Sequence, residues 1–450
     1  MGRPHVLVIS YPAQGHVMPM MELSHNLVDR GFKVTFVYTE DTHKRVVDAL
    51  SDYSEHEESI HLVSIPDGME PWEDRLQHDK HIEAMWRVMP GHFEDLIKKI
   101  DTSVDKITCI ISDEHFGWVF EIAKKMSIPS AAFWPASAVL LAVLLHIPKF
   151  IEDGILTPDG EVPKNQMIKL CPTMPAMNTD HFNWLCMGHP SLQKAIFDLN
   201  VFNTRCVKHA DYLLCNSFYE LEPSAFTLIP NLKLIGPLFA TSRLANFWPE
   251  DSTCLKWLDQ QPHGSVIYVA FGSFAVLDKR QFEELALGLE LSGIRFLWVV
   301  RPDLTKDCED VYPDGFEARV GTRGQMVGWA PQRSVLAHPS VGGFLTHCGW
   351  NSTMEALCSG VPLLCWPYFA DQKFNRSYIS DVWKIGLILN PDEDGFMTKE
   401  EVQTKVVEVL GDEEIRTKAL KYKEMALKNI SKEGASAKIF DDFVQEIVFV

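Results

Sequence analysis

The chain has 450 residues, of which 46% are hydrophobic, and its formal net charge is −19. At roughly 150 residues per domain this length predicts two or three domains, with enough apolar side chains to fill sizeable cores. The negative charge argues against nonspecific nucleic-acid binding and against docking on an anionic membrane surface. The ten cysteines include no CxxC pair, which favours buried, reduced thiols in a cytoplasmic protein.

Neither of the most apolar stretches has the features of a targeting or membrane segment. The apolar run at residues 5–10 is short and has no cleavage signature, so it predicts a first strand rather than a signal peptide. Residues 131–147 are shorter than the roughly 20 residues that a span needs, and Pro135 and His146 interrupt them. We expect a strand that ends near Pro135, then a buried helix, and no membrane span.

Strand-like and helix-like segments alternate through the first half of the chain. Buried strands are predicted for the apolar runs HVLVIS, KVTFVYT, SIHLVSIP, ITCIISD, IPSAAFWP and ADYLLCNS. Helices are expected between them, such as MMELSHNLVDRG, which Gly31 closes. Residues 148–200 are rich in Pro, Met, Asn and aromatic residues without clear periodicity, as in insertions that line binding sites. We therefore predict an α/β domain over residues 1–240.

The second half repeats this alternation. Residues 241–263 include Pro249 and Pro262 and predict an interdomain linker. A second series of strands and helices covers residues 264–432, and residues 433–450 predict a helix that could dock back on the N-terminal domain. The expected fold class is α/β. Two Rossmann-like, doubly wound domains would face each other across a cleft and bind ligands at the carboxyl ends of their strands.

The densest motif covers residues 329–372, WAPQRSVLAHPSVGGFLTHCGWNSTMEALCSGVPLLCWPYFADQ. Its first strand is VGGFLTH, its turn is GWNS with good N-cap residues, its helix is TMEALCSG with Gly360 as the stop, and its second strand is VPLLCWP. Such a unit places backbone N–H groups and a helix dipole at the carboxyl end of a strand, where a phosphate can bind.

Over its whole length this segment resembles the signature box (PSPG box) of the plant UDP-sugar-dependent glycosyltransferases of secondary metabolism, which belong to family 1. The resemblance implies the GT-B architecture of that family and a box that binds the UDP-sugar. Base and ribose contacts are implied for Trp329, Ala330, Gln332 and Glu355, diphosphate contacts for Ser273, His347, Asn351 and Ser352, and sugar contacts for Trp350, Asp371 and Gln372.

Two residues of the first half are candidates for the chemistry itself. His16 follows the first strand, where a neutral imidazole could take a proton from an acceptor hydroxyl. Asp113 ends the strand ITCIISD, and a carboxylate beside an imidazole fixes the tautomer and stabilises the imidazolium. On position alone, each residue could instead merely cap a helix or turn. The segment AQGHVMP is similar to the histidine turn of the family, which implies that His16 is the catalytic base and Asp113 its partner acid.

The resemblance also bears on the donor. In the family a Gln at the last box position, here Gln372, goes mostly with glucose, so the expected donor co-substrate is UDP-glucose. We expect no metal and no other cofactor, because a helix N-terminus together with His347 can stabilise the departing diphosphate. One departure from the family is Pro135, which stands where many relatives have a Ser or Thr that contacts the sugar. Ser137 is an alternative for that contact.

The expected function is inverting transfer of glucose from UDP-glucose to a hydroxyl of a small hydrophobic acceptor, such as a flavonoid, another phenolic or a terpenoid. A β-glucoside would result. The acceptor pocket or the apolar core would include Trp86, Phe116, Trp118, Trp134 and the loop at residues 174–187.

Three alternatives stay open. They are a non-catalytic nucleotide-sugar binder, a transferase that uses another UDP-sugar, and a C-glycoside-forming transferase. A dinucleotide oxidoreductase would need GxGxxG where this chain has YPAQGH. Nothing in the sequence demands more than a monomer, and the expected partners are the acceptor and the UDP-sugar.

Overall fold

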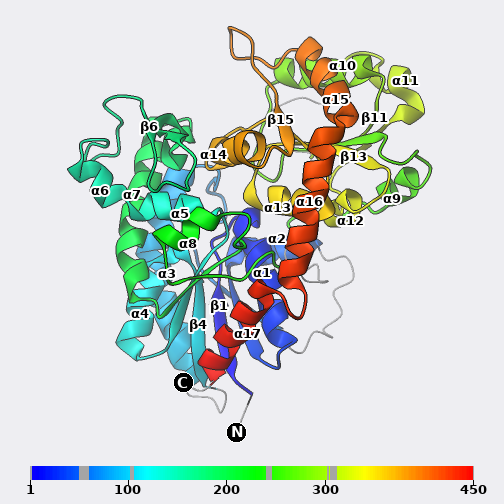
Figure 1. The fold of residues 1–450 in the computed structure, drawn as a ribbon. Coiled ribbons are helices and arrows are strands. Elements are labelled where there is room, and N and C mark those ends of the chain that lie inside the picture. Colours follow the sequence, from blue (N-terminus) through cyan, green and yellow to red (C-terminus); the bar gives the residue numbers. More distant parts are fainter. Residues whose placement is uncertain are drawn as a thin grey trace. The chain divides into compact units, whose positions relative to one another are not determined.

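The computed structural model of the protein describes residues 3–49, 60–101, 106–239, 246–301, 304 and 312–448 (Figure 1). The chain forms two compact units. The first consists of Met1–Trp248 with Lys428–Val450, and the second of Pro249–Leu427. The second unit thus begins within the stretch that the sequence predicts to be a linker.

The first unit is built on a parallel sheet, which has seven strands in the described part of the chain, in the order β3-β2-β1-β4-β5-β8-β9. Its central strands are buried on both faces, which explains why they appear in the sequence as continuous apolar runs. The strands are β1 (His5–Ile9), β2 (Lys33–Thr39), β3 (Ile60–Ile65), β4 (Ile107–Asp113), β5 (Ser130–Trp134), β8 (Tyr212–Cys215) and β9 (Leu232–Leu234).

Helices cover both faces of this sheet, because alternate residues of a strand point to opposite sides. Val6 and Val8 of β1 enter a core with α1 and α17, whereas Leu7 and Ile9 enter a core with α3 and α4. The helices and short 3-10 segments are α1 (Gln14–Val28), α2 (Glu40–Ala49), α3 (His78–Asp101), η1 (Glu114–Phe116), α4 (Trp118–Met126), α5 (Ala138–Leu145), α6 (Ile147–Glu152), η2 (Thr179–His181), η3 (Asn183–Cys186), α7 (Pro190–Cys206), η4 (Val207–His209), α8 (Pro223–Leu228) and α17 (Ala435–Val448).

The segment at residues 148–200 is more ordered than its sequence suggests. It includes a two-stranded antiparallel pair, β6 (Met167–Ile168) and β7 (Met177–Asn178). Phe182 and Trp184 are stacked and fully buried, and the Trp184 indole donates to the carbonyl of Gly160. The aromatic residues of this loop therefore form a small core of their own. Among the described residues, no helix is both long and apolar enough to cross a bilayer.

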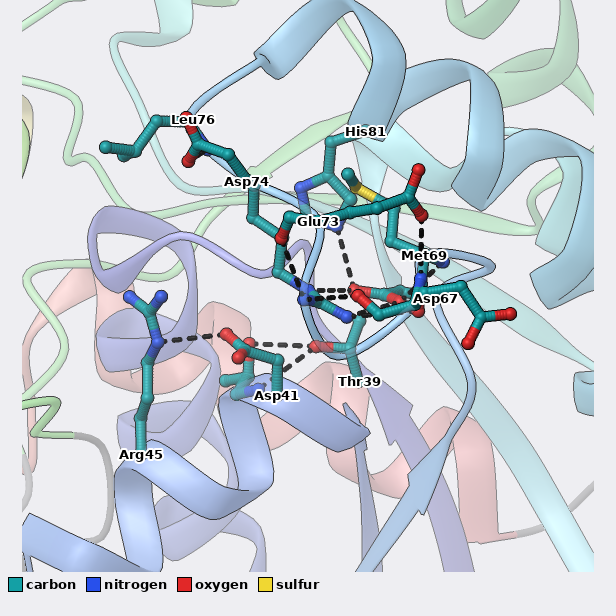
Figure 2. A network of polar contacts seen from close by, with 12 residues as sticks. Thr39, Asp41, Arg45, Asp67, Met69, Glu73, Asp74, Leu76 and His81 are labelled. Carbon is teal, nitrogen blue, oxygen red and sulfur yellow. Dashed lines mark hydrogen bonds and ion pairs between the residues drawn. The ribbon is translucent and has the colours of Figure 1, made fainter.

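A buried ion pair closes the loop between β3 and α3, residues 66–77 (Figure 2). Asp67, which is 3% exposed, accepts from Arg75 Nε at 2.7 Å and Nη2 at 3.1 Å. His81, in the first turn of α3, places its Nε2 3.1 Å from Asp67 Oδ2. Burial alone would raise the pKa of Asp67, but the bonds from His81 and Arg75 hold that pKa well below its usual range. The loop is thus anchored to the helix that follows it.

The second unit is built on another parallel sheet, six-stranded over the residues described, in the order β12-β11-β10-β13-β14-β15. Its strands are β10 (Val266–Ala270), β11 (Arg295–Val299), β12 (Gly324–Val327), β13 (Val341–Thr346), β14 (Leu363–Cys365) and β15 (Gly386–Ile388). The two parallel-sheet units confirm the predicted α/β fold class.

The helices of the second unit follow the predicted alternation with the strands. They are α9 (Thr253–Leu258), α10 (Lys279–Ser292), α11 (Phe316–Val320), η5 (Gly321–Arg323), α12 (Gln332–Leu336), α13 (Trp350–Ser359), α14 (Gln372–Ser377), the π-helical η6 (Tyr378–Val382), α15 (Lys399–Gly411) and α16 (Glu413–Ile430), whose last residues belong to the first unit.

Candidate active site

The sheet of the first unit brings His16 and Asp113 together. Strands β1 and β4 are neighbours, so the residues that follow β1 and end β4 meet at one edge of the sheet. His16 lies in the first turn of α1, and its Nδ1 is 2.7 Å from Oδ2 of Asp113. Asp113 is fully buried, whereas His16 is 22% exposed. The structure thus places the two predicted residues in direct contact, with the imidazole open to solvent.

A second imidazole shares the same carboxylate. Oδ1 of Asp113 accepts from the backbone N–H of His115 at 3.0 Å and lies 3.2 Å from His115 Nδ1. The His115 ring is stacked on Trp134 with an interplanar angle of 10°. Burial alone would raise the pKa of Asp113, but the two imidazoles hold that pKa well below its usual range. Sequence reasoning did not assign His115 to the site, although its position two residues after Asp113 was a signal.

This geometry suits a general base. An imidazole whose Nδ1–H donates to a carboxylate keeps Nε2 as its proton acceptor, and the carboxylate stabilises the imidazolium that forms. Because Asp113 is held ionised, it can fulfil this role at neutral pH.

In the second unit, the turn after β13 is shaped by an unusual backbone conformation. Cys348 has a φ of +67°, which residues other than glycine rarely adopt. Its N–H donates to Thr346 Oγ1 at 3.2 Å and its carbonyl accepts from Asn375 Nδ2 at 2.9 Å. Helix α13 then begins at Trp350, so the predicted start after GWNS is wrong by about one turn: Trp350, Asn351 and Ser352 are already helical. Its N-cap residue is Gly349, which has no side chain to cap the helix.

His347 lies between two glycines at this turn. A Cβ on Gly272 would be 2.6 Å from His347 Nε2, and one on Gly349 would be 2.5 Å from the same atom. Burial lowers the pKa of His347 to about 4, against the effect of a hydrogen bond to the Ala270 carbonyl. The positive charge of Arg301 lowers it further. The imidazole is therefore neutral at physiological pH.

Arg301 is a buried cation that sequence reasoning missed. It is 3% exposed and donates from Nη1 to the carbonyl of Ser273 at 2.7 Å and from Nη2 to that of Ala275 at 2.5 Å. It thereby holds the loop after β10, which carries Ser273, the predicted phosphate contact. Its position, directly after the apolar strand FLWVV, was the available signal, because a charged residue rarely follows such a strand without a partner.

Gln332 and Glu355 form one polar cluster. Gln332 Nε2 donates to Glu355 Oε2 at 2.6 Å and to Ser352 Oγ at 2.9 Å, and its Oε1 accepts from the Tyr268 hydroxyl at 3.2 Å. Burial raises the pKa of Glu355, while the bond from Gln332 opposes that rise. A carboxylate held in this way can accept from two neighbouring hydroxyl groups, as a ribose presents them.

The last two box residues are fixed by their neighbours. Gln372 Oε1 accepts from the N–H groups of Tyr368 and Phe369 at 2.7 and 2.9 Å, which leaves its amide nitrogen as the part that can meet a ligand. Asp371 Oδ2 accepts from Asn375 Nδ2 at 2.8 Å. Asn375 is fully buried and links Asp371 to Cys348, and it too was missed.

The other predicted donor residues differ in accessibility. Trp329 is half-buried, and its carbonyl accepts from Asp251 N–H at 2.8 Å. Ala330 is buried. The indole of Trp350 is buried near Trp383, so a ligand would meet its backbone at the start of α13 rather than its ring.

Ser137, the predicted alternative to a sugar-binding residue at position 135, has a structural function instead. It is buried, caps α5 by accepting from Leu140 N–H, and donates to the carboxylate of Glu222. Its hydroxyl is thus used within the first unit. Phe116 and Trp118 belong to the apolar core on α3 and α4.

The comparisons with known proteins identify the class of the protein. Residues 173–433, more than half of the chain, match the family model described as UDP-glucoronosyl and UDP-glucosyl transferase. The chain therefore belongs to the UDP-dependent glycosyltransferases, in the plant family 1. It is an enzyme that transfers a glycosyl group from a UDP-sugar to a small acceptor, and its two parallel-sheet α/β units have the GT-B fold.

Individual relatives cover nearly the whole chain. UDP-glycosyltransferase 83A1 of Arabidopsis thaliana is 44% identical over 99% of this chain and 97% of its own length. The 7-deoxyloganetin glucosyltransferase of Catharanthus roseus is 34% identical over 97% of this chain and 94% of its own. The solved structure of Phytolacca americana UGT2, complexed with UDP-2fluoro-glucose and pterostilbene, is similar with a TM-score of 0.81 at 26% identity, over 99% of each chain.

Proposed function

We propose that the protein transfers glucose from UDP-glucose to a hydroxyl of a small hydrophobic acceptor and inverts the anomeric centre, which gives a β-glucoside. The observation that carries this proposal is the bond between His16 and the buried carboxylate of Asp113. His16 Nε2 takes the proton of the acceptor hydroxyl. The oxygen then attacks the anomeric carbon, and the bond to UDP breaks in the same displacement.

We propose that residues 329–372, with Ser273, bind the UDP-sugar. The start of α13 offers backbone N–H groups and a positive dipole end to the diphosphate. Neutral His347 donates its one N–H to the Ala270 carbonyl and packs beside this turn. Glu355 accepts from the ribose hydroxyls. Since these groups can stabilise the departing diphosphate, the transfer needs no metal ion.

Four observations support glucose and a small hydrophobic acceptor. The Catharanthus relative is named a glucosyltransferase, and the Phytolacca structure holds a fluorinated UDP-glucose with pterostilbene. A similar structure from Polygonum tinctorium, 28% identical with a TM-score of 0.84, is described as a UDP-glucosyltransferase capable of glucosylating indoxyl. The nitrogen of Gln372 is available to a sugar hydroxyl.

We place the transfer in the cytoplasm, which agrees with free thiols at all cysteines in the described part of the chain.

UDP release tests the proposal directly. Purified enzyme is mixed with UDP-glucose and a panel of phenolic, indolic and terpenoid alcohols, and the products are analysed by mass spectrometry and by the anomeric proton coupling in NMR. We expect β-glucosides from the wild type and a loss of roughly 100-fold or more for His16→Ala. Near-normal transfer by His16→Ala would refute the assignment of the base, and UDP-glucose binding without turnover across the panel would favour a non-catalytic binder.

A further inference from the structure

Three potential metal ligands meet at the carboxylate of Asp113. One ligand atom from each of His16, Asp113 and His115 lies within 4.8 Å of the others. Within the described residues, no other group of three His, Cys, Asp or Glu side chains meets this criterion. The carboxylate is buried, but the imidazoles are 22% and 16% exposed, so that an ion can reach them from solvent.

The donor set fits Zn²⁺. Zinc in proteins takes imidazole nitrogen and carboxylate oxygen, and bonds of about 2.0–2.1 Å place tetrahedral ligand atoms roughly 3.3 Å apart. His115 Nδ1 already lies 3.2 Å from Asp113 Oδ1. The 2.7 Å between His16 Nδ1 and Asp113 Oδ2 must open by less than about 1 Å.

The rings around the cluster favour a defined geometry. The His115 ring is stacked on Trp134, and the rings of His16 and His115 meet edge to face with centroids 4.7 Å apart. The Tyr11 ring lies against both imidazoles, with its centroid 5.2 Å from that of His16 and 5.4 Å from that of His115. These aromatic contacts restrain both rings while their Nδ1 atoms lie beside the two oxygens of one carboxylate. The fourth position of a tetrahedral ion bound there would remain open to water.

We propose that Zn²⁺ binds His16, Asp113 and His115 and thereby inhibits the transferase. The ion takes the place of the proton on each Nδ1, and that proton moves through solvent to Nε2 of the same ring, so that each imidazole stays neutral. A neutral imidazole that ligates the metal through Nδ1 carries its proton on Nε2. His16 can then no longer accept the proton of an acceptor hydroxyl. Binding follows from the geometry alone, whereas inhibition rests on the proposed function of His16 as the base.

Titration calorimetry with ZnCl₂ tests the binding site. We expect one site in the wild type, and an affinity lower by at least about tenfold in His115→Phe, because even partners of metal ligands change the affinity by that much. His338→Phe is the matched control, since His338 is also a partly exposed histidine beside an aspartate, at 3.2 Å from Asp259 in the second unit. Equal affinities in the wild type and in His115→Phe would overturn the proposal.

The inhibition is measured as UDP release relative to the zinc-free rate of each variant. We expect the wild type and His338→Phe to respond to the same Zn²⁺ concentration, His115→Phe to need at least about tenfold more, and Mg²⁺ to have no effect because it prefers oxygen ligands. If zinc binds as expected but does not inhibit, while His16→Ala also stays active, the base assignment fails and the metal site stands. Inhibition of His115→Phe at the wild-type concentration would refute the inhibitory site.

A crystallographic measurement covers the case in which His115→Phe does not fold. Crystals of the wild type soaked in ZnCl₂ should give a zinc anomalous peak within bonding distance of His16, Asp113 and His115. Zinc peaks only at other positions would overturn the proposal.

Discussion

At the scale of single residues, the position of His347 depends on two glycines, which have no side chain. His347 lies against Gly272 and Gly349, and any Cβ there would approach its Nε2 to 2.6 or 2.5 Å. Gly349 has φ of −61° and ψ of 146°, which alanine adopts without strain. Gly349→Ala therefore tests whether transfer depends on the position of the His347 imidazole, because the substitution strains no backbone angle.

We expect Gly349→Ala to lower kcat/KM for the UDP-sugar by roughly 10–100-fold, since a displacement on the order of 1 Å at a reacting group costs this much. The variant should stay folded, as judged by its circular dichroism and Tm. Gly411→Ala is the control, because a Cβ there would meet nothing within 4 Å. Unchanged kinetics in Gly349→Ala would show that the position of His347 is unimportant for transfer.

Arg301 allows a second test at this scale. Its two bonds fix the carbonyls of Ser273 and Ala275, and without them the loop after β10 loses its buried anchor. We expect Arg301→Met to weaken UDP binding by at least about tenfold and to lower stability by about 3 kcal/mol, because the carbonyls remain buried without donors. Calorimetry with UDP and urea unfolding measure the two effects. Arg295→Met, at the exposed start of β11, the strand that precedes Arg301, should change neither.

At the scale of elements, strands could be predicted from sequence because buried parallel strands are continuous apolar runs that end in turn residues. The contact of His16 with Asp113 was expected from the resemblance to the family, because the positions of the two residues at strand ends also allowed each of them to cap a helix or turn. The start of α13 was not predictable in this way. Asn351 and Ser352 are good N-cap types, but the turn is set by the positive φ of Cys348 and by its bond from Asn375, which is distant in the sequence.

The conformation of the loop at residues 66–77 likewise depends on side-chain contacts, those of Asp67 with Arg75 and His81, which the local sequence pattern does not reveal (Figure 2). We expect Arg75→Met to lower the stability of the first unit by about 3 kcal/mol, because it leaves the buried carboxylate of Asp67 without its cation. Arg45→Met is the control. It removes a pair with Asp41 on an exposed helix face, which contributes about 0.5 kcal/mol or less. Urea unfolding of both variants at pH 7 measures the difference.

The same ion pair predicts a pH dependence. The pKa of Asp67 is lower in the folded than in the unfolded state, so its contribution is complete above the unfolded value of about 3.9 and is lost as the pH falls below it. We expect the stability difference between the wild type and Asp67→Asn to be constant from pH 7 to pH 5 and to shrink near pH 3.5. A difference that grows on acidification would contradict the lowered pKa.

At the scale of the whole molecule, the first unit is not one continuous stretch of the chain, because it includes the last residues of the sequence. The last helix, α17, follows the second unit in the sequence but lies beside α1 in the first (Figure 1). Phe440, Phe443 and Ile447 enter the core that Val6 and Val8 form. Arg30 of the loop after α1 donates from Nε to Asp441 at 2.8 Å. The first unit, which carries His16, is thus completed by the end of the chain.

We therefore expect Phe443→Ala to destabilise the first unit by roughly 3–5 kcal/mol, because it leaves a cavity beside Tyr212, whose ring meets Phe443 edge to face at 5.3 Å. Hydrogen exchange followed by mass spectrometry separates the units: peptides from β1 and β2 should exchange faster, whereas peptides from β10 and β13 should not change. Asp442→Ala, at an exposed position of the same helix, should alter neither set. Faster exchange in β10 and β13 as well would mean that α17 stabilises both units, and unchanged exchange in β1 would mean that the first unit folds without it.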